Sequence, residues 1–269
     1  MLIKLLKYEF LNNYKKFLTM SLSIVLAGSF AAWYKSNNTV ITVPSFSDIG
    51  VAAFITLGIV LSIFMIIGDY KQSLFSSKGF LTNTLPVEKS QIITAKIISA
   101  LFWMNLVIIA SFIANLIYSE LHFIDIAQWI INNRIASGKV EAQAVVIIAA
   151  VSIYIFMNVL LFWLFSHAFC FDAIHNICKN SFKFGEISFV ITAAYMILQI
   201  NIIDFLCKQI PLNVYLTSDT VSTNPIIKLF SIRDNFLLQF DFTILIGILF
   251  FSILTYIINA KLSKDNTTI

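Results

Sequence analysis

Residues Ile49–Gly68 read IGVAAFITLGIVLSIFMIIG, an uninterrupted run of twenty residues that contains no charged side chain. A helix of about 20 apolar residues is long enough to cross the hydrocarbon core of a lipid bilayer. Apolar runs of this length are typical of transmembrane helices rather than of the cores of soluble domains. This stretch therefore predicts a helix that spans a membrane.

Five further stretches share this apolar character. With the first they give six predicted spans: Phe17–Tyr34, Ile49–Gly68, Ile97–Tyr118, Ala144–Phe171, Ile187–Leu206 and Phe242–Ala260. Hydrophobic residues make up 59% of the 269 residues and charged residues only 12%, with a mean hydropathy of +0.87. Soluble domains contain about 45–50% apolar and about 25% charged residues. Because a helix in lipid satisfies its own backbone groups, the sequence predicts an all-α, polytopic membrane protein.

The lysine and arginine residues indicate how these helices are oriented. Twelve of the 18 lie on the side that holds both termini, and six lie on the other side. Positive residues concentrate in cytoplasmic loops, so both termini are expected in the cytoplasm. The abundance of Phe and Ile suggests an AT-rich coding sequence, and hence the plasma membrane of a bacterium. The basic residues are spread over several loops, which argues against binding to nucleic acid.

The first sixteen residues, MLIKLLKYEFLNNYKK, precede the first apolar run. At 100° per residue their apolar side chains share one half of a helical wheel: Leu2, Ile3, Leu5, Leu6, Phe10 and Tyr14. Lys4, Lys7 and Lys15 lie on the other half, while Glu9 and Lys16 break the pattern. The leader is therefore predicted as an amphipathic helix in the cytoplasmic interface. A solvated leader that only sets topology is one alternative, and a cleaved signal peptide is a less favoured one.

The predicted organisation thus has three parts. An amphipathic helix covers residues 1–16, a six-helix transmembrane domain covers 17–261, and a cytoplasmic tail covers 262–269.

The longest predicted cytoplasmic connection covers residues 69–95 and reads DYKQSLFSSKGFLTNTLPVEKSQIITA. It is too polar to span a membrane, and its leucine and phenylalanine residues make it too apolar for a disordered linker. Gly79 is suited to end a short helix, and Pro86 and Glu88 are suited to begin the next one. Exposed apolar residues on such a loop predict a docking surface. The alternative is that they pack against the protein's own helices.

Residues 79–99, GFLTNTLPVEKSQIITAKIIS, resemble the stretch G-(Y/F)-L-T-x-T-L-P-V-(S/E)-(R/K)-x-x-(I/L)-(I/L)-x-(A/S)-K of type-2 ABC exporter permeases from Firmicutes. The residues that match well are Gly79, Leu85, Pro86, Val87 and Lys96. In that family the stretch lies between the second and third spans, as it does here. The resemblance extends to the amphipathic leader, the six spans and the cytoplasmic termini.

The resemblance implies a transport subunit that moves its substrate outward by alternating access. Its implied partners are a separate ABC ATPase subunit, which holds ATP and Mg²⁺, and a second permease copy or a homologous permease within the membrane lipid. The chain itself is then expected to bind no cofactor or metal and to catalyse no reaction. In such exporters a coupling helix after the second span inserts into a cleft of the ATPase, and the leader is a connecting helix along the membrane surface.

By this resemblance, contact with the ATPase is assigned to a set of loop residues in this sequence: Tyr70, Lys71, Leu74, Phe75, Lys78, Gly79, Phe80 and Leu81. The turn from this loop into the third helix is assigned to Leu85, Pro86 and Val87.

Two connections are predicted on the outer side, residues 119–142 and residues 207–241. The first contains Trp129 and apolar residues at helical spacing, which predicts a short helix at the outer interface. The second contains Pro211 and Pro225. In the resembling exporters this region holds short re-entrant helices that cap the pathway, and a loop without function is the alternative.

The chain lacks common signatures of catalysis: it contains no P-loop, no H-E-x-x-H and no G-x-S-x-G. ATP hydrolysis for active transport is therefore expected from a partner. His167, Cys170, His175 and Cys178 repeat an H-x-x-C pattern. At 1.5 Å per residue the first and last lie about 16 Å apart along a helix, which is too far for a single metal ion. These residues are expected to pack at an interface or to hydrogen bond between helices.

Four polar residues within the predicted spans are candidates to line a pathway: Asn105, Asn158, Gln199 and Asn201. Hydrogen bonding between helices is the alternative. No acidic or basic residue is expected within the membrane, which weakens the case for an ATPase-independent transporter and favours an amphipathic substrate such as a peptide, an antibiotic or a lipid-like molecule. The other rival is a non-transporting immunity or sensory protein that binds a toxin or peptide through its outer loops.

Overall fold

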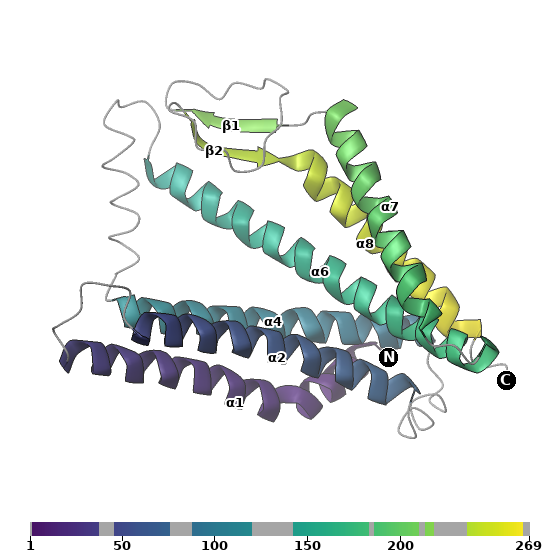
Figure 1. Cartoon of the computed structure of the whole chain (residues 1–269), viewed down its shortest axis with the longest axis horizontal. Coiled ribbons are helices and arrows are strands. Elements are labelled where there is room, and N and C mark those ends of the chain that lie inside the picture. The colour runs from purple at the N-terminus through teal and green to yellow at the C-terminus, as the bar shows by residue number, and fades with distance from the viewer. Residues whose placement is uncertain are drawn as a thin grey trace. The chain divides into compact units, whose positions relative to one another are not determined.

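A computed structural model describes residues 2–37, 46–75, 88–119, 142–182, 186–209, 213–217 and 236–265. The elements within these ranges are shown in Figure 1: α1 (Leu2–Asn37), α2 (Phe46–Phe75), α4 (Lys89–Ser119), α6 (Ala142–Phe182), α7 (Ile187–Gln209), β1 (Asn213–Thr217), β2 (Phe236–Asp241) and α8 (Phe242–Asp265).

All six helices are long and apolar enough to cross a membrane. Their surfaces carry large apolar side chains, such as Phe64, which is 66% exposed, and Phe189, which is 69% exposed. Side chains of this kind are stable on a helix surface when lipid replaces water as the solvent. The predicted all-α class and the six membrane-spanning helices are therefore confirmed.

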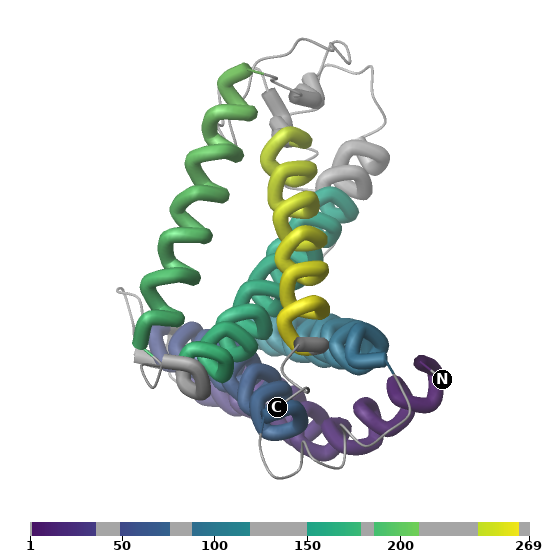
Figure 2. Tube along the Cα trace, turned by 90° about the vertical axis from the view of Figure 1, so that its right-hand side faces the viewer, coloured from purple at the N-terminus to yellow at the C-terminus, as the bar shows by residue number. Residues whose placement is uncertain are grey.

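The chain divides into two compact units, Met1–Phe123 and Ile124–Ile269. In unit 1, α1 packs along α4, and α2 contacts both of them. Figure 2 shows these three helices in purple and blue, lying side by side. In unit 2, α6 packs mainly against α8, and α7 contacts both. Each unit thus contains three of the six apolar helices.

Glycine residues allow the helices of unit 1 to approach each other closely. A Cβ atom placed on Gly28 of α1 would lie 2.8 Å from the Cβ and the carbonyl oxygen of Ala114 in α4. A Cβ atom on Gly58 of α2 would lie 2.7 Å from Cδ1 of Ile24 in α1. Small residues at such crossings permit backbone contact, which is how helices commonly associate in membranes.

The leader and the first apolar run form one helix. α1 contains 36 residues and is about 54 Å long at 1.5 Å per residue, whereas the hydrocarbon core of a bilayer is about 30 Å thick. Its ends therefore extend beyond that core. No helix end separates residues 1–16 from residue 17 onward, so the three-part division of the chain stays a prediction.

Helices also continue into the predicted 69–95 connection. α2 runs on from Gly68 to Phe75, and α4 already begins at Lys89. The predicted separate short helix is wrong over residues 69–75, which are the last turns of α2. The physical reason is that Lys, Gln and Leu are good helix formers, so the helix does not stop where its apolar run stops.

β1 and β2 form an antiparallel ribbon, in which Asn213 pairs with Asp241 and Leu216 pairs with Leu238. The described ends of the 207–241 connection are thus strands, where the resemblance implied short helices. Their β-branched and aromatic residues favour extended backbone. Residues 218–235 lie outside the described residues, and so does nearly all of the interfacial helix predicted within 119–142.

Candidate functional site

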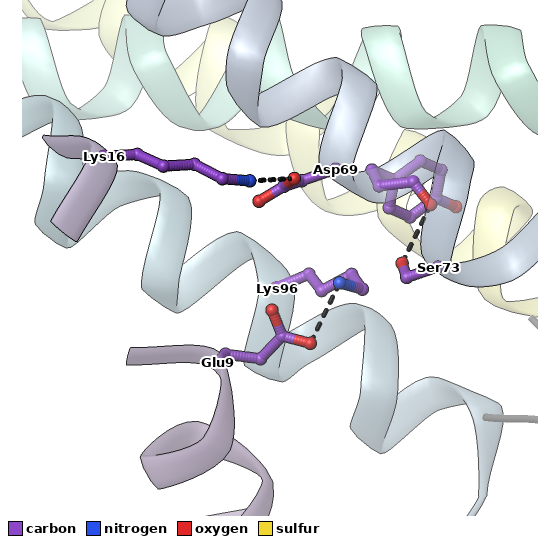
Figure 3. Close-up of polar contacts among 6 residues, drawn as sticks. Glu9, Lys16, Asp69, Ser73 and Lys96 are labelled. Atoms are coloured by element: carbon purple, nitrogen blue, oxygen red, sulfur yellow. Dashed lines mark hydrogen bonds and ion pairs between the residues drawn. The ribbon is translucent and has the colours of Figure 1, made fainter. Parts of the chain in front are cut away.

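Two ion pairs join α1 to its neighbours in unit 1 (Figure 3). Lys96 Nζ of α4 donates to Glu9 Oε1 at 2.9 Å, and Lys16 Nζ donates to Asp69 Oδ1 of α2 at 2.9 Å. The Lys96 side chain is only 6% exposed and that of Glu9 is 21% exposed. Removing either partner of this first pair would leave a charge with little access to solvent.

Glu9 lies on the inward side of α1, which explains why it interrupts the apolar pattern of the leader. Asn13, one turn later, is buried, whereas Ile3 is 82% exposed and Tyr14 is 42% exposed. The inward side of the leader therefore differs from the predicted apolar half at Ile3 and Tyr14. Glu9 is placed there by its bond to Lys96, a residue 87 positions away.

Aromatic rings attach the same part of α1 to α4. The Trp103 ring of α4 stacks on Phe17 with a centroid distance of 5.4 Å and meets Phe10 at 6.1 Å. Phe102 contacts Phe10 edge to face at 4.9 Å. Such ring pairs add to the free energy gained from burial alone. The leader is thus connected to α4 by both an ion pair and a set of ring contacts.

Four of the predicted coupling residues form the last turns of α2. Tyr70 and Leu74 are buried, Lys71 is exposed and Phe75 is half-buried. The rings of Tyr70 and Phe75 meet edge to face at 6.0 Å, and the Ser73 hydroxyl donates to the Tyr70 carbonyl at 2.9 Å. Of these four side chains, Lys71 offers the most surface to a partner and Phe75 offers some.

The remaining residues of the predicted coupling loop and of the turn lie outside the described residues: Lys78, Gly79, Phe80, Leu81, Leu85, Pro86 and Val87. Description resumes at Glu88, directly before α4. The backbone N–H of Gln91 donates to the Glu88 carbonyl at 2.9 Å, and the Ser90 hydroxyl donates to the Glu88 carboxylate at 3.2 Å. Glu88 thus precedes α4, where the sequence predicts it in the first turn, and a carboxylate next to a helix N-terminus is favoured by the helix dipole.

Unit 2 contains a buried group of polar side chains that joins its three helices. Gln199 Oε1 of α7 accepts from Trp163 Nε1 of α6 at 3.2 Å and lies 2.9 Å from His167 Nε2. Thr255 Oγ1 of α8 lies 3.4 Å from the same His167 nitrogen and 3.1 Å from the Tyr195 hydroxyl of α7. We call these five residues the polar cluster. His167, Gln199 and Thr255 are each at most 1% exposed.

The four polar residues predicted to line a pathway are not brought together. Gln199 belongs to the polar cluster of unit 2. The side-chain amides of Asn105, Asn158 and Asn201 each donate to the carbonyl four residues earlier in their own helix. Asn105 lies in unit 1 and the others lie in unit 2. Lining of a pathway by these residues stays a prediction.

The predicted hydrogen bonding of histidines between helices is confirmed. His167 contacts Gln199 of α7, and His175 Nδ1 of α6 lies 3.1 Å from Ser188 Oγ of α7. Cys170 and Cys178 are buried free thiols. Among the residues that the structure describes, no three His, Cys, Asp or Glu side chains are grouped as a metal site.

Two acidic residues, Asp172 and Asp204, lie on the apolar helices α6 and α7, and the expectation that no acidic residue lies within the membrane itself stays a prediction. α6 continues to Phe182, and the apolar helix that contains Asp172 buries its side chain to 6% exposure. Asp204 lies near the end of the apolar α7 and forms an ion pair with Lys208, four residues later.

Sequence reasoning did not find the polar cluster as a unit. The available signal is the spacing of Trp163 and His167, because residues four apart lie on one face of a helix. Their partners Gln199 and Thr255 are 32 and 88 residues further from His167 along the chain. Only the packing of three helices brings these side chains together.

No family model, no curated protein and no solved structure matches this chain. The likeness of residues 79–99 to exporter permeases therefore stays a resemblance.

Proposed function

We propose that this chain is the membrane-spanning permease subunit of an ATP-driven ABC exporter. The observation that carries the proposal is the way α1 holds both sides of the 76–88 connection. Asp69, near the end of α2, is bonded to Lys16, and Lys96, near the start of α4, is bonded to Glu9. A force applied to this connection by a partner is then transmitted to three apolar helices at once.

In the proposed mechanism a separate ATPase subunit binds ATP and Mg²⁺ and pushes on the connection after α2. Because ion pairs and ring contacts tie α1 to α2 and α4, unit 1 moves as one body. A second copy of this chain, or a homologous permease, completes the pathway within the lipid. This chain contributes no catalytic residue, and its part is to convert the movement of the partner into outward opening.

The proposed substrate is amphipathic: a peptide, an antibiotic or a lipid-like molecule. The described helices carry mainly apolar side chains on their surfaces, and the polar cluster bonds largely to itself, so a small hydrated ion finds few ligands there. The proposed location is the bacterial plasma membrane, with both termini in the cytoplasm. The excess of lysine on that side supports this orientation.

The first test is affinity purification of the tagged chain from native membranes in mild detergent, followed by mass spectrometry. A stoichiometric P-loop ATPase is expected to copurify with the natural chain. Its absence, together with no effect of added nucleotide, would remove the exporter assignment.

The coupling role is tested with Lys71→Glu combined with Phe75→Asp, because these two side chains offer surface at the end of α2. This variant is expected to insert normally and to lose at least tenfold of the copurified ATPase. Lys7→Glu, a charge reversal at an exposed residue of α1, is the matched control. Equal ATPase recovery with both variants would show that the end of α2 is not the docking surface.

A further inference from the structure

The protonation state of His167 is constrained on one side by a backbone carbonyl. His167 Nδ1 lies 2.8 Å from the carbonyl oxygen of Trp163. A carbonyl oxygen only accepts hydrogen bonds, so Nδ1 must carry a proton and donate it. Whether the ring is neutral or cationic then depends on its other nitrogen, Nε2, which faces Gln199.

The orientation of the Gln199 amide is set by Trp163. The indole Nε1–H is a donor only, and it lies 3.2 Å from Gln199 Oε1. If the Gln199 amide were flipped, its NH2 group would face the N–H of Trp163, and two donors would oppose each other. The same Oε1 lies 2.9 Å from His167 Nε2, so this ring nitrogen also faces an acceptor. A bond at that position requires a proton on Nε2 as well.

The environment of the amide nitrogen, Gln199 Nε2, is consistent with a proton on His167 Nε2. Gln199 is fully buried, and its Nε2 has no hydrogen-bond partner among the described residues. A buried donor without a partner is unfavourable. If His167 Nε2 were an unprotonated acceptor, the amide would gain a partner by turning over. The observed orientation is the one that a doubly protonated ring favours.

Two aromatic rings lie close to the imidazole of His167. The Trp163 ring lies 4.5 Å from the imidazole, and the Tyr195 ring stacks on it at 5.8 Å. A cation within about 6 Å of an aromatic face is attracted by the ring quadrupole. The Thr255 hydroxyl donates to the Phe251 carbonyl at 2.7 Å, so its lone pairs are available to His167 and to the Tyr195 hydroxyl.

The side chains around His167 come from all three helices of unit 2. On α6 they are Cys170, which is buried, and Asp172, which lies five residues later and about 140° around the helix at 100° per residue. α7 contributes Tyr195, which is in contact with the ring. α8 faces it with Thr255, and the first charged residue of α8 is Lys261. In the described part of unit 2, the acceptors bonded to the ring are thus neutral oxygens.

We propose that His167 is a proton-binding site that joins α6 to α7 and α8. A proton taken from water adds to the lone pair of Nε2 and gives an imidazolium bonded to Gln199 and to the Trp163 carbonyl. On release the proton returns to water and the ring keeps its Nδ1 proton. A flip of the Gln199 amide then lets its NH2 group donate to Nε2, at the expense of the hydrogen bond from Trp163. This site does not depend on the exporter assignment, and it would make the packing of unit 2 respond to pH.

The test is ¹⁵N NMR of the full chain in lipid nanodiscs, with His122→Gln and His175→Gln so that His167 is the one remaining histidine of three. At acidic pH both ring nitrogens of His167 are expected to carry a proton, and raising the pH should remove the proton from Nε2 alone. A ring with an unprotonated Nε2 at neutral pH and below would overturn the proposal.

Two variants test the role of the amide. Trp163→Phe keeps a ring but removes the N–H that orients Gln199, so the doubly protonated fraction should fall several-fold at the pH where His167 of the natural chain is half protonated. Gln199→Glu supplies an acceptor that cannot turn over, and it should keep the second proton to higher pH. Tyr154→Phe, which changes an exposed ring of α6 outside the polar cluster, is the control, and its doubly protonated fraction should match that of the natural chain. An unchanged fraction in Trp163→Phe, or a neutral ring in Gln199→Glu, would contradict the proposal.

Discussion

At the scale of single residues, Glu9 and Lys96 show how a charged pair is accommodated in an apolar structure. Glu9→Gln leaves Lys96, which is 6% exposed, without its counter-charge. Loss of one partner of a buried pair costs about 3–5 kcal/mol. Because Glu9 is 21% exposed and solvent screens part of the charge, we expect a cost of about 2 kcal/mol. Unfolding of the purified variant in lipid–detergent mixtures measures this cost.

The second ion pair of α1 provides the matched comparison. The Lys16 side chain is 48% exposed, and an exposed pair contributes at most about 1 kcal/mol. Lys16→Gln is therefore expected to unfold almost like the natural chain. The double variant Glu9→Leu with Lys96→Met should recover most of the stability lost in Glu9→Gln, because no buried charge remains. A Lys16→Gln protein that is the less stable of the two single variants would refute this ranking.

At the scale of secondary-structure elements, the contact of α1 with α4 depends on Gly28. Gly28→Ala would place a Cβ 2.8 Å from the backbone oxygen of Ala114, and a backbone cannot rotate away as a side chain can. We expect a clear loss of thermal stability in Gly28→Ala. Gly68→Ala is the control, since nothing lies within 4 Å of a Cβ at that position, and alanine there should be neutral or slightly stabilising. Equal effects of the two substitutions would contradict this account of the α1–α4 contact.

The elements themselves were largely predictable, because apolar run length is a local property of the sequence. Their ends were not: α2 continues from Gly68 to Phe75 because polar helix formers extend a helix after the apolar run stops. Partners far apart in sequence were not predictable either. In the sequence, Glu9 only interrupts the apolar pattern of the leader, and its partner Lys96 is 87 residues away. Gln199 is one of four separate polar residues in the predicted spans, and nothing in the sequence connects it with His167. Such pairs depend on tertiary packing, which no local pattern encodes.

At the scale of the whole molecule, polar chemistry is distributed differently in the two units. Unit 1 uses ion pairs, and two of them hold α1 to α2 and α4. In unit 2 the described ion pair, Asp204–Lys208, lies within α7, and the helices are joined by the polar cluster, to which α6 and α7 contribute two side chains each and α8 contributes one. If both proposals hold, a partner acts on unit 1 and a proton acts on unit 2. The two effects are then separable by experiment, since no residue is shared between them.

The orientation of the whole chain is the remaining prediction at this scale. Lys71 lies near the end of α2 that leads into the predicted cytoplasmic connection, and Lys35 lies near the opposite end of α1; both are exposed. Each is replaced by cysteine in a background in which Cys170, Cys178 and Cys207 are changed to serine or alanine. In intact cells a membrane-impermeant thiol reagent should label Lys35→Cys and spare Lys71→Cys, which should react only after permeabilisation. The reverse pattern would invert the topology, and with it the assignment of the 76–88 connection to a cytoplasmic ATPase, because that partner and its ATP are available on one side of the membrane only.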